Sequence, residues 1–481
     1  MGKPIITPEE YYQSIRDMKT PIWAFGELRT DNPDFKLFKP HVDAVALIYK
    51  VAMQPEYDDL MNATSHLTGK RISRFNHIHQ GTDDLLKKVR MLRMINNKSA
   101  CCIQRCAGTD ALNATYIVTY EIDKKYGTDY HQKFKKYLTY LQDENKVVIG
   151  AMTDVKGDRT KKPSAQRDPD LHVHVVEERK DGIVVRGAKV HITGVTSAHE
   201  VMVFPTTNLG ATDIDYACVF SLPINTPGIT YIFGRQSNDG RKLEEGTIDM
   251  GNPFGVVGGE CMMVFNDVFV PWENIYMYKQ YEFAGMFVEA FATAHRQNYG
   301  ACKGGIGDVL LGAVYDIAAS MGIAKASAVR DKMADMIHMI ETGYACSIAC
   351  SCEGARHESG AWKANTMLAN TSKHNITKFV YEENRLAQDI CGGILATLPS
   401  EADFRNPTVG PLIEKYLQAV EGYSTEERMR MFRLVECLTG GTACVEAMHG
   451  AGPPAAQKVM YLRDANFDYK VRIAKDLVGI K

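Results

Sequence analysis

The stretch Val173-His-Val-Val-Glu-Glu-Arg-Lys-Asp-Gly-Ile-Val-Val-Arg186 contains two short runs that are rich in β-branched residues. Between the runs lies the turn sequence Arg179-Lys-Asp-Gly182. Valine and isoleucine favour strands, and an Asp-Gly pair flanked by such runs is typical of a β-hairpin. The stretch therefore predicts a pair of antiparallel strands in the middle of the chain.

More strand-like runs follow the hairpin, separated by segments that contain Gly, Pro, Asn and Asp. They are Val201-Met-Val-Phe204, Cys218-Val-Phe-Ser-Leu222, Ile229-Thr-Tyr-Ile-Phe233 and Met262-Met-Val-Phe265. Short strands at such spacing are typical of a small antiparallel barrel or sandwich. We expect a central antiparallel β-barrel domain over residues 151–280.

Helical patterns lie on both sides of this region. Thr7 can cap a helix that has Pro8 at its first position, and Glu10 completes a capping box. Residues 83–94 continue the helical periodicity. In the last part of the chain, one helical face is marked by Met333, Met336, Ile337, Ile340 and Tyr344. The sequence predicts an α+β fold with an N-terminal helical domain (1–150), the barrel, and a C-terminal helical bundle (281–481).

The composition carries no charge signal. The chain has 481 residues, of which 45% are hydrophobic and 24% charged, and its net charge is −2. So small a charge supplies no field that would attract nucleic acid or an anionic membrane. No apolar run approaches the roughly 20 residues of a membrane span, and the first ten residues have no apolar signal-peptide core. We expect a cytoplasmic protein with no nucleic-acid or membrane partner.

Four soft metal ligands occur as two pairs far apart in the sequence. Cys102 and Cys106 lie in Ser99-Ala-Cys-Cys-Ile-Gln-Arg-Cys106, and His295 and Cys302 lie in His295-Arg-Gln-Asn-Tyr-Gly-Ala-Cys302. Thiolate and imidazole suit iron–sulfur or zinc coordination. Each pair taken alone is more often structural, as buried thiols or a hydrogen-bonded histidine. A metal site requires that all four ligands meet.

Helix geometry makes two predictions about these ligands. If residues 102–106 are helical, Cys102 and Cys106 share one face, whereas Cys101 points about 100° away. In an unbroken helix His295 and Cys302 are about 10 Å apart along the axis, which is far for one small cluster. Because Gly300 permits a bend, we expect the helix to be interrupted near residues 299–301.

A rival set of thiols lies at Cys346, Cys350 and Cys352. The first two share a helical face, but the third lies off it, and the surrounding sequence is rich in Ala and Ser. Unpaired cysteine commonly behaves as a small buried hydrophobe. We therefore interpret these three as packed helix thiols rather than metal ligands.

Five motifs along almost the whole chain resemble those of one family. They are Cys102-Ile-Gln-Arg-Cys106, Ala151-Met-Thr-Asp-Val-Lys-Gly-Asp-Arg159, Arg186-Gly-Ala-Lys-Val-His-Ile-Thr-Gly194, His295-Arg-Gln-Asn-Tyr-Gly-Ala-Cys-Lys303 and Glu446-Ala-Met-His-Gly-Ala-Gly452. Together they are similar to the 4-hydroxybutyryl-CoA dehydratase (vinylacetyl-CoA isomerase) family, whose wider relatives are flavin-dependent 4-hydroxyphenylacetate hydroxylases. The resemblance implies an acyl-CoA dehydrogenase-like fold, in which helices are followed by a β domain and a helical bundle.

The resemblance also implies two cofactors and a homotetramer built as a dimer of dimers. A [4Fe–4S] cluster would be held by Cys102, Cys106, His295 and Cys302. FAD would be bordered by Met152, Thr153, Asp154, Lys156, Gly157, Asp158, Arg159, His191, Ile192, Thr193 and Gly194. Gly157 and Gly194 would let the backbone approach the flavin closely. A neighbouring subunit's FAD would be reached by Gln388, Gly392 and Gly393.

Three further residues carry over as catalytic groups beside His295: Tyr299, Glu260 and Glu446. Glu446 lies in a stretch of small apolar residues, where an unpaired carboxylate would be costly or would have a raised pKa. The implied reaction is dehydration of 4-hydroxybutyryl-CoA to crotonyl-CoA by a flavin radical mechanism, with the cluster as Lewis acid. His295 could release iron and act as a base. Isomerisation of vinylacetyl-CoA to crotonyl-CoA is implied as a second activity.

Two other functions fit parts of the pattern. An FAD-dependent monooxygenase that acts on a phenol would share the fold but would have no use for four converging metal ligands. A protein with a structural Cys3His zinc site would need no flavin. The contents of iron, sulfide, zinc and flavin distinguish the three classes.

Overall fold

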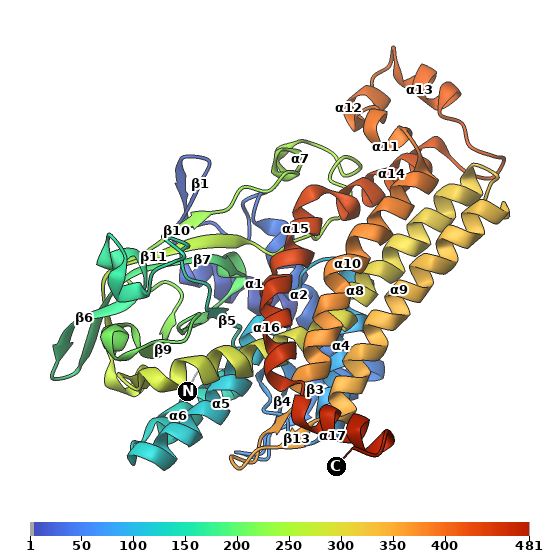
Figure 1. The fold of residues 1–481 in the computed structure, drawn as a ribbon. Coiled ribbons are helices and arrows are strands. Elements are labelled where there is room, and N and C mark those ends of the chain that lie inside the picture. The colour runs from blue at the N-terminus through green and yellow to red at the C-terminus, as the bar shows by residue number, and fades with distance from the viewer. Residues whose placement is uncertain (1–3, 481) are drawn as a thin grey trace.

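Helices fill most of the first part of the chain in the computed structural model, which describes residues 4–480 (Figure 1). They are α1 (Pro8–Met18), α2 (Lys39–Ala52), α3 (Asp58–Met61), α4 (Thr82–Ser99), α5 (Cys106–Tyr126) and α6 (Tyr130–Glu144), with the small hairpin of β3 (Asn62–Thr64) and β4 (Arg71–Ser73) between α3 and α4. The predicted capping box is present, because Thr7 and Glu10 each accept a hydrogen bond from the other's backbone N–H. The helix predicted at residues 83–94 is confirmed as part of α4.

The predicted central hairpin is also confirmed. β6 (His174–Arg179) pairs antiparallel with β7 (Gly182–Thr193), and Arg179 lies opposite Gly182. Three of the four later strand runs lie within strands, and the run at residues 201–204 extends one residue beyond β8, which ends at Val203. The remaining strands of the two large sheets are β1 (Ile22–Ala24), β2 (Glu27–Arg29), β5 (Val148–Ala151), β8 (Glu200–Val203), β9 (Cys218–Pro223), β10 (Ile229–Phe233), β11 (Glu260–Pro271) and β12 (Ile275–Tyr278).

The predicted antiparallel barrel is wrong. Within residues 4–480 the strands form two open sheets, ordered β2-β1-β10-β11-β7-β6 and β12-β9-β8-β5. Each sheet contains one parallel pair, β1 with β10 and β5 with β8. The sheets share one core, in which the rings of Phe220 in β9 and Phe265 in β11 lie 6.0 Å apart. The region is a two-sheet sandwich, and its larger sheet is extended by strands from the N-terminal segment.

Long helices form the last part of the chain, and Figure 1 shows α8 (Ala284–Ser320), α9 (Ser327–Cys352) and α10 (Thr366–Cys391) side by side. The shorter helices are α7 (Asp239–Leu243), α11 (Ile394–Thr397), α12 (Glu401–Phe404), α13 (Gly410–Tyr416), α14 (Thr425–Thr439), α15 (Gly441–His449), α16 (Pro454–Asp464) and α17 (Phe467–Leu477), and β13 (Ala355–Arg356) pairs with β14 (Trp362–Lys363). On α9, Met336 of the predicted helical face is buried, but Ile337 is 49% exposed. Successive residues of a helix point about 100° apart around its axis, so Ile337 points away from the side on which Met336 packs. None of the described helices is long and apolar enough to cross a bilayer.

The predicted interruption near Gly300 is wrong, because α8 runs unbroken from Ala284 to Ser320. A Cβ on Gly300 would overlap the carbonyl oxygen of Gly343 in α9. The glycine therefore permits close packing of two helices rather than a bend. His295 and Cys302 consequently lie two turns apart on one face of a straight helix.

Replacing Gly300 with alanine is expected to lower the free energy of unfolding by about 2 kcal/mol, because overpacking forces α8 away from α9. Gly312→Ala on the same helix is the matched control, since a Cβ there meets no atom within 4 Å. The control should be neutral or stabilising by up to about 1 kcal/mol. Urea unfolding measures both, and equal effects at the two positions would contradict the packing role.

Candidate active site

α8 carries the centre of the site. His295, Tyr299 and Cys302 follow one another at spacings of four and three residues, so their side chains lie on one face of the helix. Cys106 is the first residue of α5, and Cys102 lies in the loop before it. Because α4 and α5 both pack against α8, ligands from distant parts of the sequence come together.

A loop sets the position of Cys102. Residues 101–105 are not helical, so the prediction that Cys102 and Cys106 share a helical face is wrong. Gln104 adopts a left-handed conformation with φ of 64°. Its Nε2 donates to the carbonyl oxygen of His41 at 2.7 Å, which ties the loop to α2.

The thiols of Cys102, Cys106 and Cys302 lie within electrostatic reach of one another. Burial raises the pKa of Cys302 to about 11. Burial raises the pKa of Cys106 well above its usual value, and the neighbouring Cys102 thiol adds to the effect. Thiolates here need a nearby cation, and a metal centre would supply that charge.

The spacing of the ligands bears on the kind of metal site. Within residues 4–480, no three His, Cys, Asp or Glu side chains are placed to hold a single metal ion. A structural zinc site needs its four ligands around one ion. A four-iron cluster keeps its ligands further apart, which suits the two turns of α8 between His295 and Cys302. Three thiols and one imidazole are a donor set that iron–sulfur clusters and zinc both accept, so donor type alone does not distinguish them.

Asp110, which was not among the predicted site residues, holds His295. The distance from His295 Nδ1 to Asp110 Oδ2 is 2.7 Å, and Asn298 Nδ2 donates to the same oxygen at 2.7 Å. Lys88 of α4 donates to Asp110 Oδ1 at 2.6 Å, and both side chains are buried. Burial raises the pKa of Asp110, but the Lys88 charge and the His295 hydrogen bond outweigh it, so the net pKa lies below its usual value. An ionised carboxylate at Nδ1 leaves Nε2 as the nitrogen available to a metal.

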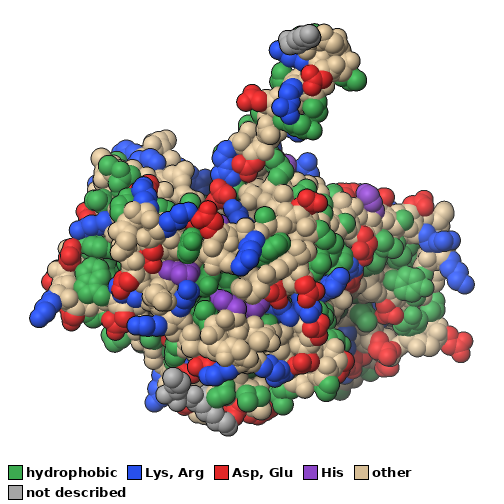
Figure 2. Space-filling model, turned by 90° about the horizontal axis from the view of Figure 1, so that it is seen from below, with side chains coloured by type: hydrophobic (Ala, Val, Ile, Leu, Met, Phe, Trp, Pro, Cys, Tyr) green, Lys and Arg blue, Asp and Glu red, His purple; other side chains and the backbone are tan. Residues whose placement is uncertain are grey.

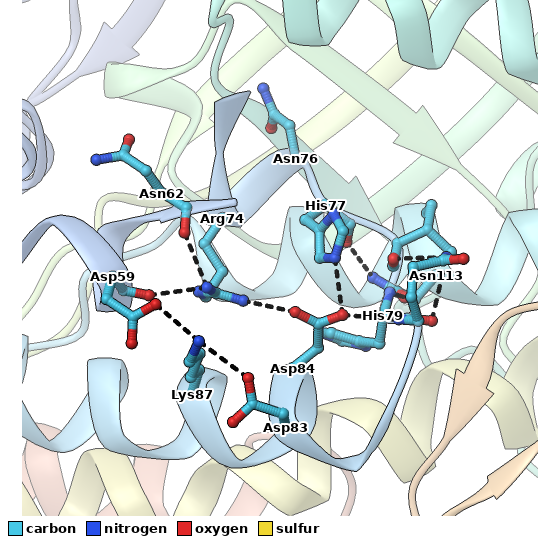
Figure 3. Close-up of polar contacts among 12 residues, drawn as sticks. Asp59, Asn62, Arg74, Asn76, His77, His79, Asp83, Asp84, Lys87 and Asn113 are labelled. Atoms are coloured by element: carbon cyan, nitrogen blue, oxygen red, sulfur yellow. Dashed lines mark hydrogen bonds and ion pairs between the residues drawn. The ribbon is translucent and has the colours of Figure 1, made fainter. Parts of the chain in front are cut away.

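A second buried network fixes the start of α4 (Figure 3). Figure 3 shows Arg74 and His77 converging on Asp84, which accepts from Arg74 Nη1 and His77 Nε2 at 2.9 Å each. Asn113 of α5 donates to the carbonyl oxygen of His77 at 3.1 Å. The network joins α4 to α5. These two helices supply Lys88 and Asp110, the ion pair that is hydrogen-bonded to His295.

Glu446 of α15 is paired, so its pKa is not raised. Its Oε1 accepts from the Tyr299 hydroxyl at 3.0 Å, and its Oε2 forms an ion pair with Lys303. Burial raises the pKa of Glu446, but the Lys303 charge and hydrogen bond outweigh it and leave the pKa below its usual value. Lys303 is the last residue of the motif that begins at His295, and we did not predict it as a site residue. Its position four residues after Tyr299 places the two side chains on the same helical face, which is a signal that the sequence contains.

Glu260 is the carboxyl group whose pKa is raised. It lies opposite Thr193 in the β11–β7 ladder and accepts from Thr193 Oγ1 at 2.7 Å. Burial raises the pKa of Glu260 to about 8, and the charge of Glu446 adds to the effect. Glu260 therefore lies between Thr193, a predicted flavin-side residue to which it is hydrogen-bonded, and Glu446, which is within its electrostatic reach.

The Glu260→Gln substitution is expected to change how stability depends on pH. The pKa of Glu260 is about 8 in the folded state and 4.5 ordinarily, so its contribution is fully present below pH 4.5 and is lost as the pH rises to about 8. Relative to the wild type, the variant should gain about 3–4 kcal/mol between about pH 5 and pH 8. Chemical unfolding at both pH values measures this, and a difference that does not vary with pH would contradict it.

The predicted FAD residues gather where β7, the loop after β5 and the end of α15 meet. Residues 152–159 form the loop, and residues 191–194 end β7 and follow it. Asp154 forms an ion pair with Lys189 of β7, which ties the loop to the strand. Burial lowers the pKa of His191, and the charges of Lys156 and His449 add to the effect. The three segments thus present basic side chains to one another.

Two glycines of the predicted flavin border, Gly157 and Gly194, pack closely against protein atoms in the direction that a Cβ would take. A Cβ on Gly157 would lie 2.6 Å from Gln166 Oε1, and one on Gly194 would lie 2.9 Å from Ile149 Cγ2. Both have positive φ, of 49° and 91°. Their role in this structure is to allow left-handed turns in tight packing.

Gln388, Gly392 and Gly393 do not join this group within one chain. They are exposed at the end of α10, where Gln388 Nε2 donates to Thr439 Oγ1 at 3.2 Å. Figure 1 shows this end of α10, next to α11, on the far side of the bundle from the sheets.

Comparisons with known proteins identify the family. Residues 7–277 match the family model for the 4-hydroxyphenylacetate 3-hydroxylase N terminal, and residues 284–479 match the one for its C terminal. The chain is 48% identical to 4-hydroxybutyryl-CoA dehydratase/vinylacetyl-CoA-Δ-isomerase of Clostridium aminobutyricum, over 99% of this chain and 100% of that protein. The chain belongs to the 4-hydroxybutyryl-CoA dehydratase family. This family lies within the wider 4-hydroxyphenylacetate 3-hydroxylase family, and the chain is an enzyme.

Solved structures agree with this placement. An oxygen-tolerant archaeal 4-hydroxybutyryl-CoA dehydratase from N. maritimus has a TM-score of 0.97 and 44% identity, covering 99% of this chain and 95% of that chain. The oxygenase component of 4-hydroxyphenylacetate 3-monooxygenase complexed with FAD has a TM-score of 0.85 at 24% identity over 98% of each chain. Butyryl-CoA dehydrogenase of Megasphaera elsdenii has a TM-score of 0.50 at 16% identity, over 93% of this chain and 96% of that chain. The last two show only that this dehydratase-family chain shares its fold with flavin hydroxylases and acyl-CoA dehydrogenases.

Proposed function

We propose that this enzyme eliminates water from 4-hydroxybutyryl-CoA to give crotonyl-CoA, and that it also isomerises vinylacetyl-CoA to crotonyl-CoA. The observation that carries the proposal is one buried site in which Cys102, Cys106, His295 and Cys302 lie with the Tyr299–Glu446–Lys303 group. A phenol monooxygenase has no use for this donor set. The 48% identity to a dehydratase over its full length supports the same substrate class.

FAD and a [4Fe–4S] cluster are the proposed cofactors. The cluster would be held by Cys102, Cys106, Cys302 and His295 Nε2, and FAD would lie against the loop after β5 and the end of β7. When bound, the cluster supplies a Lewis acid for the leaving hydroxyl, and the flavin accepts and returns one electron.

The charge balance of the site supports an anionic group there. Arg296 and Lys373 are both buried. Among the described residues, neither forms an ion pair: Arg296 donates to Asn370 Oδ1 and to the Ala451 carbonyl, and Lys373 donates to backbone carbonyls. Buried cations are costly unless an opposite charge compensates them. Lys373 lies within electrostatic reach of Cys302, so an anionic group bound beside that thiol would add compensating charge.

The chain's own groups can move the protons that the reaction requires. The thioester carbonyl acidifies the C2 proton of the substrate but not the C3 proton, so two bases in different surroundings are needed. Glu446 is ionised and hydrogen-bonded to the Tyr299 hydroxyl, so this pair can accept a proton. The His295 imidazole, oriented by Asp110, is the proposed second base, and it could accept a proton at Nε2 only when that nitrogen is not bound to iron. Glu260, with a pKa of about 8, stays protonated near neutral pH and can donate a hydrogen bond.

We propose that the enzyme is a homotetramer. α17 has no buried residue, and it exposes Phe467, Val471 and Leu477. Figure 2 shows the C-terminal end of the chain projecting from the body as an arm. Apolar side chains gathered on an exposed helix are typical of an interaction surface. The exposed Gln388 and Gly392 fit a second subunit contact near a neighbour's flavin.

Anaerobic purification with an absorption spectrum and metal analysis tests the proposal. We expect about four iron and four sulfide per chain, bound FAD, and formation of crotonyl-CoA from 4-hydroxybutyryl-CoA. Flavin without iron, together with hydroxylation of a phenol when a flavin reductase is present, would favour a monooxygenase. Zinc without flavin would contradict both enzymatic functions.

A further inference from the structure

Lys373 of α10 contacts the Tyr299 ring and the backbone that directly follows Glu446, yet it lies in no motif and in no proposed step. Its Nζ donates to the carbonyl oxygen of Ala447 at 2.5 Å and to that of Met448 at 3.4 Å. These residues directly follow Glu446 in α15. On its other side, Nζ lies 3.9 Å from the centre of the Tyr299 ring.

The surroundings of Lys373 are costly for a cation and are not needed for packing. Its side chain is fully buried, and burial lowers its pKa to about 7, against the opposing charge of Glu446. Methionine would fill a similar volume without burying a charge. The compensation comes from two attractions, the carbonyls at the C-terminal end of a helix and the face of an aromatic ring. Both belong to the elements that carry the catalytic pair.

The contact between α15 and Tyr299 leaves little room for displacement. A Cβ on Gly450, just after α15, would overlap the Tyr299 hydroxyl and would lie 3.0 Å from Glu446 Oε1. A small shift of α15 would therefore break the 3.0 Å hydrogen bond between Tyr299 and Glu446. Misplacement of a catalytic group by about 1 Å can cost on the order of a hundredfold in rate.

We propose that Lys373 is a positioning residue, which holds the end of α15 and the ring of Tyr299 so that the Glu446 carboxylate meets the Tyr299 hydroxyl. The kinetic consequence rests on the proposed dehydratase function. The contact itself does not, because it is formed by the side chain and backbone of this chain alone.

The test replaces Lys373 with methionine in the holoenzyme, with Lys378→Met as the control on the exposed side of the same helix. We expect Lys373→Met to lower kcat at least about tenfold while KM for 4-hydroxybutyryl-CoA changes less than about threefold. Iron and FAD contents should stay at the wild-type level in both variants, and the control should keep the wild-type kcat. Loss of either cofactor in Lys373→Met would overturn the proposal, because it would indicate a general structural role.

A double-mutant cycle with Glu446→Gln separates positioning from indirect damage. If Lys373 acts through Glu446, adding Lys373→Met to the Glu446→Gln variant should lower kcat by less than about threefold further. A full tenfold loss in both backgrounds would overturn the proposal. Lys373→Arg, which keeps donors and charge, should recover part of the rate that methionine loses.

The same cycle is also measured on thermal unfolding, so that it does not depend on the substrate. The two substitutions should change Tm non-additively, because the side chains share the end of α15. Additive changes would overturn the positioning role. If the wild-type enzyme fails to dehydrate 4-hydroxybutyryl-CoA, the proposed function fails, and the unfolding cycle still decides the role of Lys373.

Discussion

Replacing Cys302 with alanine is expected to remove the iron–sulfur cluster and to lower the rate of dehydration by on the order of a thousandfold or more. Cys302 is the thiol that α8 contributes to the site, three residues after Tyr299 and on the same face. Without it the proposed cluster would keep the His295 imidazole of α8 and two thiols, those of Cys106 and Cys102, from the start of α5 and the loop before it. Iron and sulfide analysis, the absorption spectrum and the dehydratase assay measure the effect.

Cys350→Ala is a matched control for this substitution. Both cysteines lie in long helices, and each donates to the carbonyl three residues earlier, Cys302 to Tyr299 at 3.7 Å and Cys350 to Ser347 at 3.2 Å. The two substitutions remove the same sulfur atom from similar surroundings, but only Cys302→Ala should lose iron. Retention of iron and activity in Cys302→Ala would exclude it as a ligand. Iron loss in both variants would indicate that general destabilisation is being measured.

The parts of the fold that could be predicted depend on local interactions. The capping box at Thr7 involves residues three apart, and the hairpin that joins Arg179 to Gly182 is closed by a two-residue turn. The shape of the sheets depends on distant pairing instead. Ile22 lies opposite Tyr231 in a parallel pair, and no periodicity within either segment indicates such a partner. A barrel was therefore predicted where two open sheets form.

In the site, too, the candidate ligands could be predicted from their residue types, whereas the residues that position them could not. Thiol and imidazole chemistry singled out Cys102 and His295, whereas the groups that hold them are ordinary polar residues, Gln104 in the loop before α5 and Asp110 within α5. Asp110 lies one turn after Cys106, a spacing that acquires meaning only when α5 packs on α8. Gly300 illustrates the reverse error, because a glycine that could permit a bend in fact permits contact with Gly343.

The two carboxylates that we predict to be catalytic, Glu446 and Glu260, show why pKa values need the structure. Glu446, in small apolar sequence, was expected to be the perturbed group if it was unpaired. Lys303 forms an ion pair with Glu446 and keeps it ionised. The pKa of Glu260 is raised instead, because Glu260 is buried and its hydrogen-bond partner Thr193 carries no charge. Opposite surroundings for two acids in one site separate their roles as proton acceptor and proton donor.

Replacing Asp110 with alanine is expected to have the largest effect on stability, a loss of about 3–5 kcal/mol. The substitution leaves the Lys88 ammonium buried, with only the Ala294 carbonyl at 3.1 Å and Gln297 Oε1 at 3.3 Å as hydrogen-bond partners. It also frees the His295 ring, so iron should be released to a chelator about 10–100 times faster than from the wild type. Urea unfolding measures the first effect, and the rate of chelator-coloured iron release measures the second.

Two further variants separate the charge of Asp110 from its hydrogen bond. Asp110→Asn keeps an acceptor for His295 Nδ1–H but still strands the Lys88 charge, so it should retain iron better than the alanine variant while remaining destabilised. Adding Lys88→Met removes the stranded charge and should recover much of the lost stability without changing iron release. If the alanine variant holds iron as long as the wild type does, Asp110 does not orient His295. If the double variant is no more stable than Asp110→Asn alone, the instability comes from disturbed helix packing and not from an uncompensated charge.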